Sequence, residues 1–78
     1  MSTIVVKMIE SRNFMGEPVT TISEHEICYS LIEGYRARKR KYFSAPDYHV
    51  TDLPELFRAE SVRGDYTIEY RFTSVKDY

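Results

Sequence analysis

Residues 66 to 74, "YTIEYRFTS", alternate cleanly between apolar or aromatic side chains and polar ones. In an extended chain, one face would carry Tyr66, Ile68, Tyr70 and Phe72, and the other would carry Thr67, Glu69, Arg71 and Thr73. Because successive side chains of a β-strand point to opposite faces of the sheet, the stretch predicts a half-buried antiparallel strand. We therefore expect a sheet that is covered on one face only.

The start of the chain predicts two more strands. Residues 3 to 10, "TIVVKMIE", are β-branched and apolar, and both faces of the extended stretch would be partly apolar, as in a central strand. Residues 19 to 22, "VTTI", are expected to return beside it as a second strand. Asn13, Gly16 and Pro18 are turn-forming residues between the two stretches, so we expect a hairpin with a longish loop.

The middle of the chain predicts a long helix from residue 24 to about residue 40. Ser23 and Glu26 have the spacing of a capping box, in which each side chain accepts a hydrogen bond from a backbone amide at the start of the helix. The apolar stripe of this helix would consist of Ile27, Cys28, Leu31, Ile32 and Tyr35. The opposite face would carry Tyr29, Glu33, Arg36 and Arg40.

A second, shorter helix is expected from residue 52 to about residue 61. Asp52 and Glu55 repeat the capping-box spacing, and Pro54 is tolerated in the first turn of a helix. The sequence thus predicts the order β-β-α-α-β. We expect a single α+β domain spanning residues 1–78, in which one long and one short helix cover one face of a three-stranded, mainly antiparallel sheet.

The single cysteine and the apolar pattern bear on the cellular location. With only Cys28, no disulfide can form within the chain, which fits a reducing compartment better than secretion. The first residues lack the pattern of a signal peptide, and no stretch approaches the ~20 apolar residues that a membrane-spanning helix needs. We therefore expect a cytoplasmic protein that does not contact membranes.

The residues suited to catalysis or metal binding form no recognisable constellation. Cys28 lies on the predicted apolar stripe, where a free cysteine is usually a small buried hydrophobe. His25, Cys28 and His49 are the only soft metal ligands, and they do not recur in the pairs typical of a zinc site. The sequence therefore predicts no enzyme, no cofactor and no metal.

Residues 35 to 43, "YRARKRKYF", concentrate positive charge in a chain of net charge −1. The cations are Arg36, Arg38, Lys39, Arg40 and Lys41. One interpretation is nucleic-acid binding, in which these groups neutralise phosphates while Tyr35, Tyr42 or Phe43 stacks on unpaired bases. The remainder of the chain carries six basic and twelve acidic residues, which provides no second basic patch to follow a nucleic-acid backbone.

The interpretation we favour from the sequence is protein binding by a small regulator, inhibitor or adaptor. Tyr29, Arg36 and Arg40 would form a row along the outer helix face, supported by Arg38, Lys39 and Lys41. Tyrosine and arginine are enriched where protein interfaces bind most strongly. A homo-oligomer formed through the free face of the sheet, or through an edge strand such as 19–22, remains open. A further alternative is capture of a small phosphorylated ligand between subunits.

Overall fold

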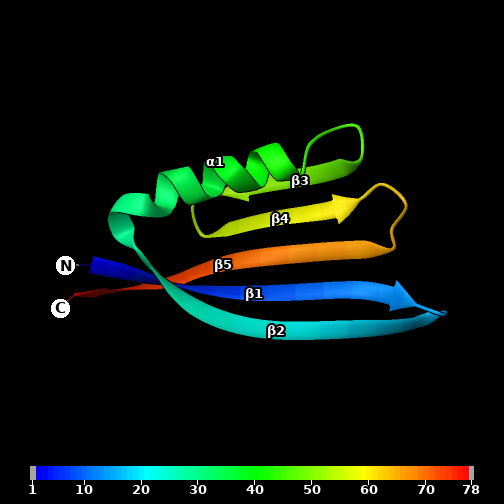
Figure 1. Cartoon of the computed structure of the whole chain (residues 1–78), viewed down its shortest axis with the longest axis horizontal. Coiled ribbons are helices and arrows are strands. Elements are labelled where there is room, and N and C mark those ends of the chain that lie inside the picture. Colours follow the sequence, from blue (N-terminus) through cyan, green and yellow to red (C-terminus); the bar gives the residue numbers. More distant parts are fainter. Residues whose placement is uncertain (1, 78) are drawn as a thin grey trace.

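The computed structural model describes the backbone of residues 2–77 and the side chains of residues 2–73. Its elements follow one another as β1 (Ser2–Phe14), β2 (Glu17–Cys28), the short 3-10 helix η1 (Tyr29–Leu31), α1 (Ile32–Tyr42), β3 (Tyr48–Leu53), β4 (Leu56–Ser61) and β5 (Tyr66–Asp77). The strands form one five-stranded sheet in the order β2-β1-β5-β4-β3, and every neighbouring pair is antiparallel (Figure 1). The last strand of the chain therefore lies at the centre of the sheet.

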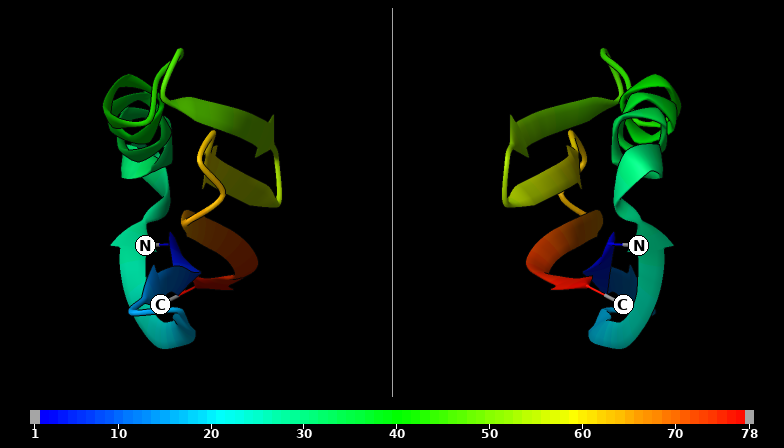
Figure 2. Two further views of the ribbon diagram at one scale, coloured as in Figure 1. Left: turned by 90° about the vertical axis from the view of Figure 1, so that its right-hand side faces the viewer. Right: turned by 90° about the vertical axis from the view of Figure 1, so that its left-hand side faces the viewer.

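The sheet curls around the helix. Figure 2 shows α1 on the concave side of the sheet, with the strands passing around it from β3 to β2. The body is elongated, with principal extents of 45 × 24 × 15 Å. The opposite, convex side is left uncovered by any helix that the structure describes, so the sheet has one covered and one open face.

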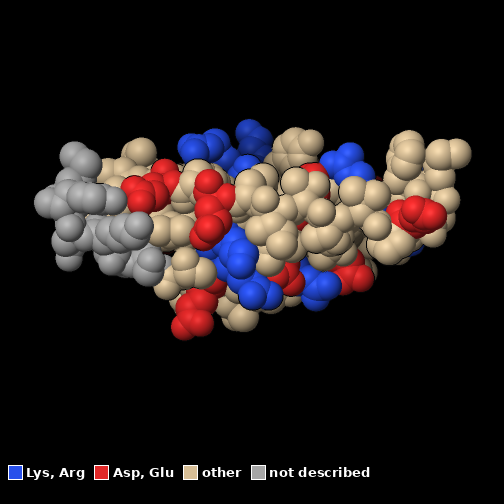
Figure 3. Space-filling view, turned by 90° about the horizontal axis from the view of Figure 1, so that it is seen from below, with Lys and Arg blue, Asp and Glu red and all other residues tan. Residues whose placement is uncertain are grey.

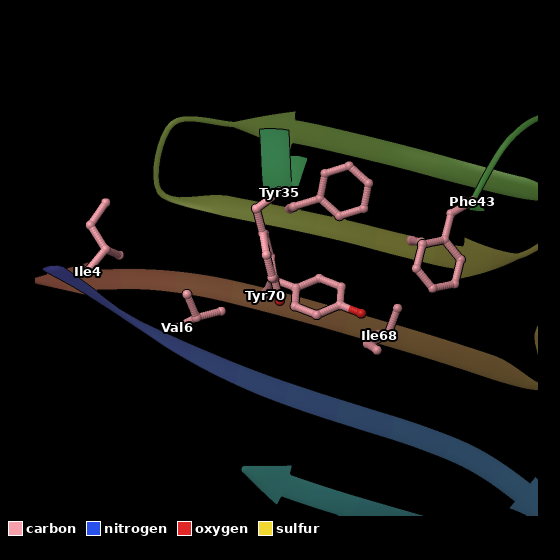
Figure 4. Close-up of a cluster of buried hydrophobic side chains, with 8 residues drawn as sticks. Ile4, Val6, Tyr35, Phe43, Ile68 and Tyr70 are labelled. Atoms are coloured by element: carbon pink, nitrogen blue, oxygen red, sulfur yellow. The ribbon is translucent and has the colours of Figure 1, made fainter. Parts of the chain in front are cut away.

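The core lies between α1 and the concave face of the sheet. It consists of Ile4 and Val6 from β1, Phe57 and Ala59 from β4, Ile68 and Tyr70 from β5, and Tyr35 and Phe43 from the helix and its end (Figure 4). The Tyr35 ring packs edge-on against the rings of Tyr70 and Phe72, with centroid separations of 5.8 and 6.2 Å. Such edge-to-face pairs stabilise beyond the apolar area that they bury. They fix the rotation of α1 on the sheet.

The hairpin of β1 and β2 turns through only two residues. Phe14 pairs with Glu17, and between them Met15 and Gly16 both have positive φ angles, of 53° and 83°. Two successive positive φ values define the type I′ turn, whose twist matches that of the flanking strands. The longish loop expected from the sequence is therefore absent. Both strands instead continue to the turn, and β2 is far longer than the predicted stretch 19–22.

The predicted fold of a three-stranded sheet with one long and one short helix is wrong. Residues 23–28 were expected to begin the long helix, but they belong to β2 and pair with residues 3–8 of β1. The first α-helical residue is Ile32, and the helix continues to Tyr42. A stretch such as "SEHEIC" also alternates, with His25 and Ile27 on the concave side. Pairing with β1 outweighs the local capping-box signal at Ser23.

The second predicted helix does not exist either. Residues 48–53 and 56–61 form the hairpin of β3 and β4, joined at Pro54 and Glu55. In β4, Phe57 and Ala59 are fully buried, while their neighbours are only partly covered, which is the two-residue period of a strand. A strand places Phe57 and Ala59 on the same buried face, whereas a helix would turn residues two apart to different sides.

The strands predicted at residues 3–10 and 66–74 are confirmed, within the longer β1 and β5. The alternation of residues 66–73 has the predicted orientation. Tyr70 and Ile68 are buried beneath the helix, whereas Arg71 and Thr73 are exposed. The direction of β5 relative to β1, which the sequence left open, is antiparallel.

Candidate functional site: a cleft between the helix and the β3–β4 hairpin

Arg36 and Arg40 both bind Asp52, which lies in β3. The Nη1 atom of Arg36 donates to one carboxylate oxygen of Asp52 at 2.8 Å, and Nη1 of Arg40 donates to the other at 2.6 Å. Arg36 also donates to the backbone carbonyl of Pro54, and its guanidinium lies 4.4 Å from the centre of the Phe72 ring. Arg36 is therefore buried between α1, the hairpin and β5, with 9% of its surface exposed.

Lys39 lies against the aromatic core. Its ammonium nitrogen is 5.1 Å from the ring centre of Tyr35 and 4.9 Å from that of Tyr70, which are cation–π distances. Burial lowers the pKa of Lys39, and the nearby Arg38 guanidinium lowers it further. Burial also raises the pKa of the Tyr35 hydroxyl, and it raises that of Tyr70 to about 12. Both phenols are thus neutral at physiological pH.

A cleft of about 410 Å³ opens between the start of the helical segment and the turn of the β3–β4 hairpin. We name it the helix–hairpin cleft. It is lined by Ile4, Tyr29, Ile32, Glu33, Arg36, Asp52, Leu53, Pro54 and Phe72. The lining thus combines aliphatic and aromatic side chains with the Arg36–Asp52 ion pair.

Among the lining residues of the cleft, two large apolar side chains are half exposed. Tyr29 is 53% exposed and Leu53 is 52% exposed. They come from η1 and from the end of β3, on the two segments between which the cleft opens. Leu31, two residues after Tyr29 in η1, is 58% exposed but does not line the cleft. The cleft thus offers apolar contact area together with fixed charges.

The structure separates the residues that the sequence grouped as a partner-binding row. Tyr29 and Arg36 line the helix–hairpin cleft together. Arg40 is joined to Arg36 through Asp52, so the row follows the side of α1 that faces the hairpin rather than the outer side. Lys39 lies on the core, whereas Arg38 and Lys41 are exposed to solvent.

The three aromatic residues considered for base stacking have different environments. Tyr35 and Phe43 are core residues, 9% and 4% exposed, and their rings contact other aromatic rings. Tyr42 is 75% exposed and packs one edge against Phe43. Only Tyr42 presents most of its surface to solvent.

The sequence reasoning missed Asp52, Leu53 and Pro54, because it placed them at the start of a helix. No local pattern reveals that Asp52 meets cations sixteen and twelve residues earlier in the chain. One local feature could have indicated the hairpin: the proline of "DLPELF" is also compatible with a turn between two strands. That interpretation would have placed Leu53 at a hairpin end.

The remaining chemically distinctive groups are isolated. The Cys28 thiol lies 3.5 Å from the Ser30 hydroxyl, and the hydrogen bonds to Ser30 lower the pKa of Cys28. Within residues 2–73, no three His, Cys, Asp or Glu side chains lie close enough to hold a metal ion together. The helical segments that the structure describes include none of the length and apolarity needed to cross a membrane.

Comparisons of the chain with protein-family models, with curated protein sequences and with solved structures find no match. The arguments for function below therefore rest on the chemistry of the residues described above.

Proposed function

We propose that this protein is a small binding protein that recognises another protein through the helix–hairpin cleft, as a regulator, inhibitor or adaptor. The observation that supports this proposal is the placement of half-exposed Tyr29 and Leu53 at a cleft whose lining includes Arg36. Tyrosine and arginine dominate the strongest contacts in protein interfaces, where an apolar anchor is surrounded by polar groups. The cleft provides both kinds of group.

The ordering of Arg36 favours binding at this place. Its guanidinium is already held by Asp52, by the Pro54 carbonyl and by the Phe72 ring. These contacts hold the hairpin against α1, so a partner does not have to immobilise this part of the cleft lining, a step that usually costs about 0.5–1.5 kcal/mol for each flexible side chain. Pre-ordered polar groups beside an apolar anchor are therefore an efficient recognition surface.

The nucleic-acid and phosphorylated-ligand alternatives have less support from the geometry. Arg36 and Arg40 share the carboxylate of Asp52, and Lys39 lies on the Tyr35 and Tyr70 rings. Two cations of the basic stretch, Arg38 and Lys41, remain exposed without an ion pair among the described side chains. Two phosphate contacts would give a log–log salt slope of only about −2.

The proposal is tested by comparing two exposed tyrosines. A photoreactive phenylalanine analogue placed at position 29, in the cells that make the protein, identifies the partner by cross-linking. We then expect Tyr29→Ala to raise the Kd for that purified partner by about 30-fold, as for a hot-spot residue. Tyr42→Ala is the matched control, because Tyr42 is also exposed but does not line the cleft. It should change the Kd less than about threefold.

Two results would contradict the proposal. Equal losses of affinity in the Tyr29 and Tyr42 variants would show that the cleft is not the binding surface. Binding of labelled nucleic acid with a salt slope of about −3 to −5, abolished by neutralising residues 36–41, would instead assign the basic stretch to phosphate contacts. Circular dichroism of each variant establishes that the fold is retained.

A further inference from the structure

The outer edge of β2 is exposed along nearly the whole strand. β2 is the first strand in the sheet order, so it pairs with β1 on one side only. Ten of its twelve residues are exposed. A strand in this position presents backbone N–H and C=O groups that can pair with a further strand.

The two-residue turn determines which backbone groups point outward. In a hairpin with such a turn, the residues that flank the loop, here Phe14 and Glu17, exchange backbone hydrogen bonds, and bonded pairs then alternate along the ladder. The odd-numbered residues of β2 therefore bond to β1. The even-numbered residues, including Thr20, Ile22 and Glu24, direct their backbone groups to the free edge.

Two observations agree with this assignment. The Asn13 amide donates to the Asp65 carbonyl at 3.0 Å, so an odd residue of β1 bonds away from β2, as the alternation requires. Pro18, which has no N–H, occupies an even position of β2. Its missing donor therefore lies on the free edge, where proline is tolerated in sheets.

The side chains of β2 indicate the charge of a partner strand. The strand carries Glu17, Glu24 and Glu26 and no lysine or arginine. Glu24 and Glu26 share one face of the sheet, where Glu24 lies across from Lys7 of β1, and Glu17 points to the other face. Figure 3 views the molecule from the side on which β2 lies, and both acidic and basic side chains occur on this face. A second copy of the chain would bring three further carboxylates to the same edge, whereas opposite charges across neighbouring strands are stabilising. The β2 edge is therefore better suited to pair with a basic strand than with the β2 edge of a second copy of the chain.

We propose that the β2 edge binds an extended, basic segment of a partner protein by strand addition. The segment pairs with the outward backbone groups of Thr20, Ile22 and Glu24, and its lysines or arginines lie on the face that carries Glu24. Main-chain hydrogen bonds supply affinity in this mode of recognition, and the alternating side chains supply specificity. This surface is separate from the helix–hairpin cleft, whose lining contains no residue of β2.

Amide hydrogen exchange with a defined probe tests the proposal. The probe is a blocked seven-residue peptide of alternating lysine and valine, and its counterpart has glutamate in place of lysine. In the free protein, the amides of Thr20, Ile22 and Glu24 should exchange rapidly, and those of Thr21 and Ser23 slowly. Saturating basic peptide should slow the even-numbered amides at least tenfold, whereas the acidic peptide should not change them.

A proline scan separates edge pairing from side-chain contact. Ile22→Pro removes one outward donor and leaves the bonds to β1 in place, so the variant should fold but lose at least tenfold in peptide affinity. Ile22→Ala is the matched control, because it shortens the same side chain and keeps the N–H. It should retain affinity within about threefold, since backbone groups carry most of the binding in this mode.

Three results would overturn the proposal. The first is that the even-numbered amides exchange at an unchanged rate in saturating basic peptide, and the second is that Ile22→Pro binds the peptide as well as Ile22→Ala does. Protection that grows with protein concentration alone would show that a second copy occupies the edge. None of these results bears on Tyr29 at the helix–hairpin cleft, so the two surfaces are tested independently.

Discussion

Replacing Phe57 by alanine is expected to lower the free energy of unfolding by about 3–5 kcal/mol, the largest effect of any single side-chain truncation proposed for this chain. Phe57 has no exposed surface and contacts the rings of Phe43 and Tyr70. Its removal would leave a cavity between α1 and the sheet that the surrounding backbone can only partly fill. Because small domains have a total stability of about 5–15 kcal/mol, this loss removes a large part of the free energy that holds the domain folded. Urea unfolding followed by circular dichroism measures the change.

Phe14→Ala is the matched control for this experiment. Phe14 has the same side chain but is 64% exposed beside the β1–β2 turn. Its truncation should change the free energy of unfolding by no more than about 0.5 kcal/mol. Similar losses in the two variants would mean that Phe57 does not occupy the centre of the core.

Replacing Asp52 by alanine is expected to cost about 2–3 kcal/mol of stability. The change leaves Arg36, which is 9% exposed, without its carboxylate partner, and it also frees Arg40. Breaking a fully buried ion pair by removing one partner typically costs about 3–5 kcal/mol, and the 26% exposure of the Asp52 side chain reduces the expected value. Chemical unfolding of the variant measures the loss.

Glu60→Ala provides the comparison for Asp52→Ala. Glu60 lies 3.6 Å from Arg58, and both side chains are more than 40% exposed, so the pair should contribute less than about 0.5 kcal/mol. In the Arg36→Met background, removal of Asp52 should cost distinctly less than in the wild-type chain. Equal costs in both backgrounds would show that the two groups are not energetically coupled.

Local alternation predicted the central strand β5, and a β-branched apolar run predicted β1, but the sequence pattern failed where two periods compete. The residues from 66 to 73 alternate without exception, so no helical arrangement of them has a coherent apolar face. Residues 23–28 satisfy a helical capping box and a strand alternation at once. Only the presence of β1 as a neighbouring strand decides between the two. The pairing of β1 with β2 extends from the turn as far as Thr3 and Cys28.

The same limitation applies to the candidate site. Arginine in a short basic run suggested a solvent-facing surface, and the run does contain exposed Arg38 and Lys41. The burial of Arg36 depends on Asp52, and the two residues meet only because the chain returns through β3. The sequence alone offers no means of pairing them. Tyr29 was chosen as part of the outer face of a long helix, whereas it lies in η1, where it is 53% exposed.

The position of β5 has a consequence for how the chain is made. β5 follows every other element in the sequence, yet it joins the β1–β2 pair to the β3–β4 pair. While a ribosome synthesises the chain, these two hairpins cannot join until residues beyond Tyr66 have emerged, and each keeps an unpaired inner strand. Folding of the sheet must therefore follow synthesis of its last strand. During that interval the nascent chain exposes two edges that are prone to aggregation.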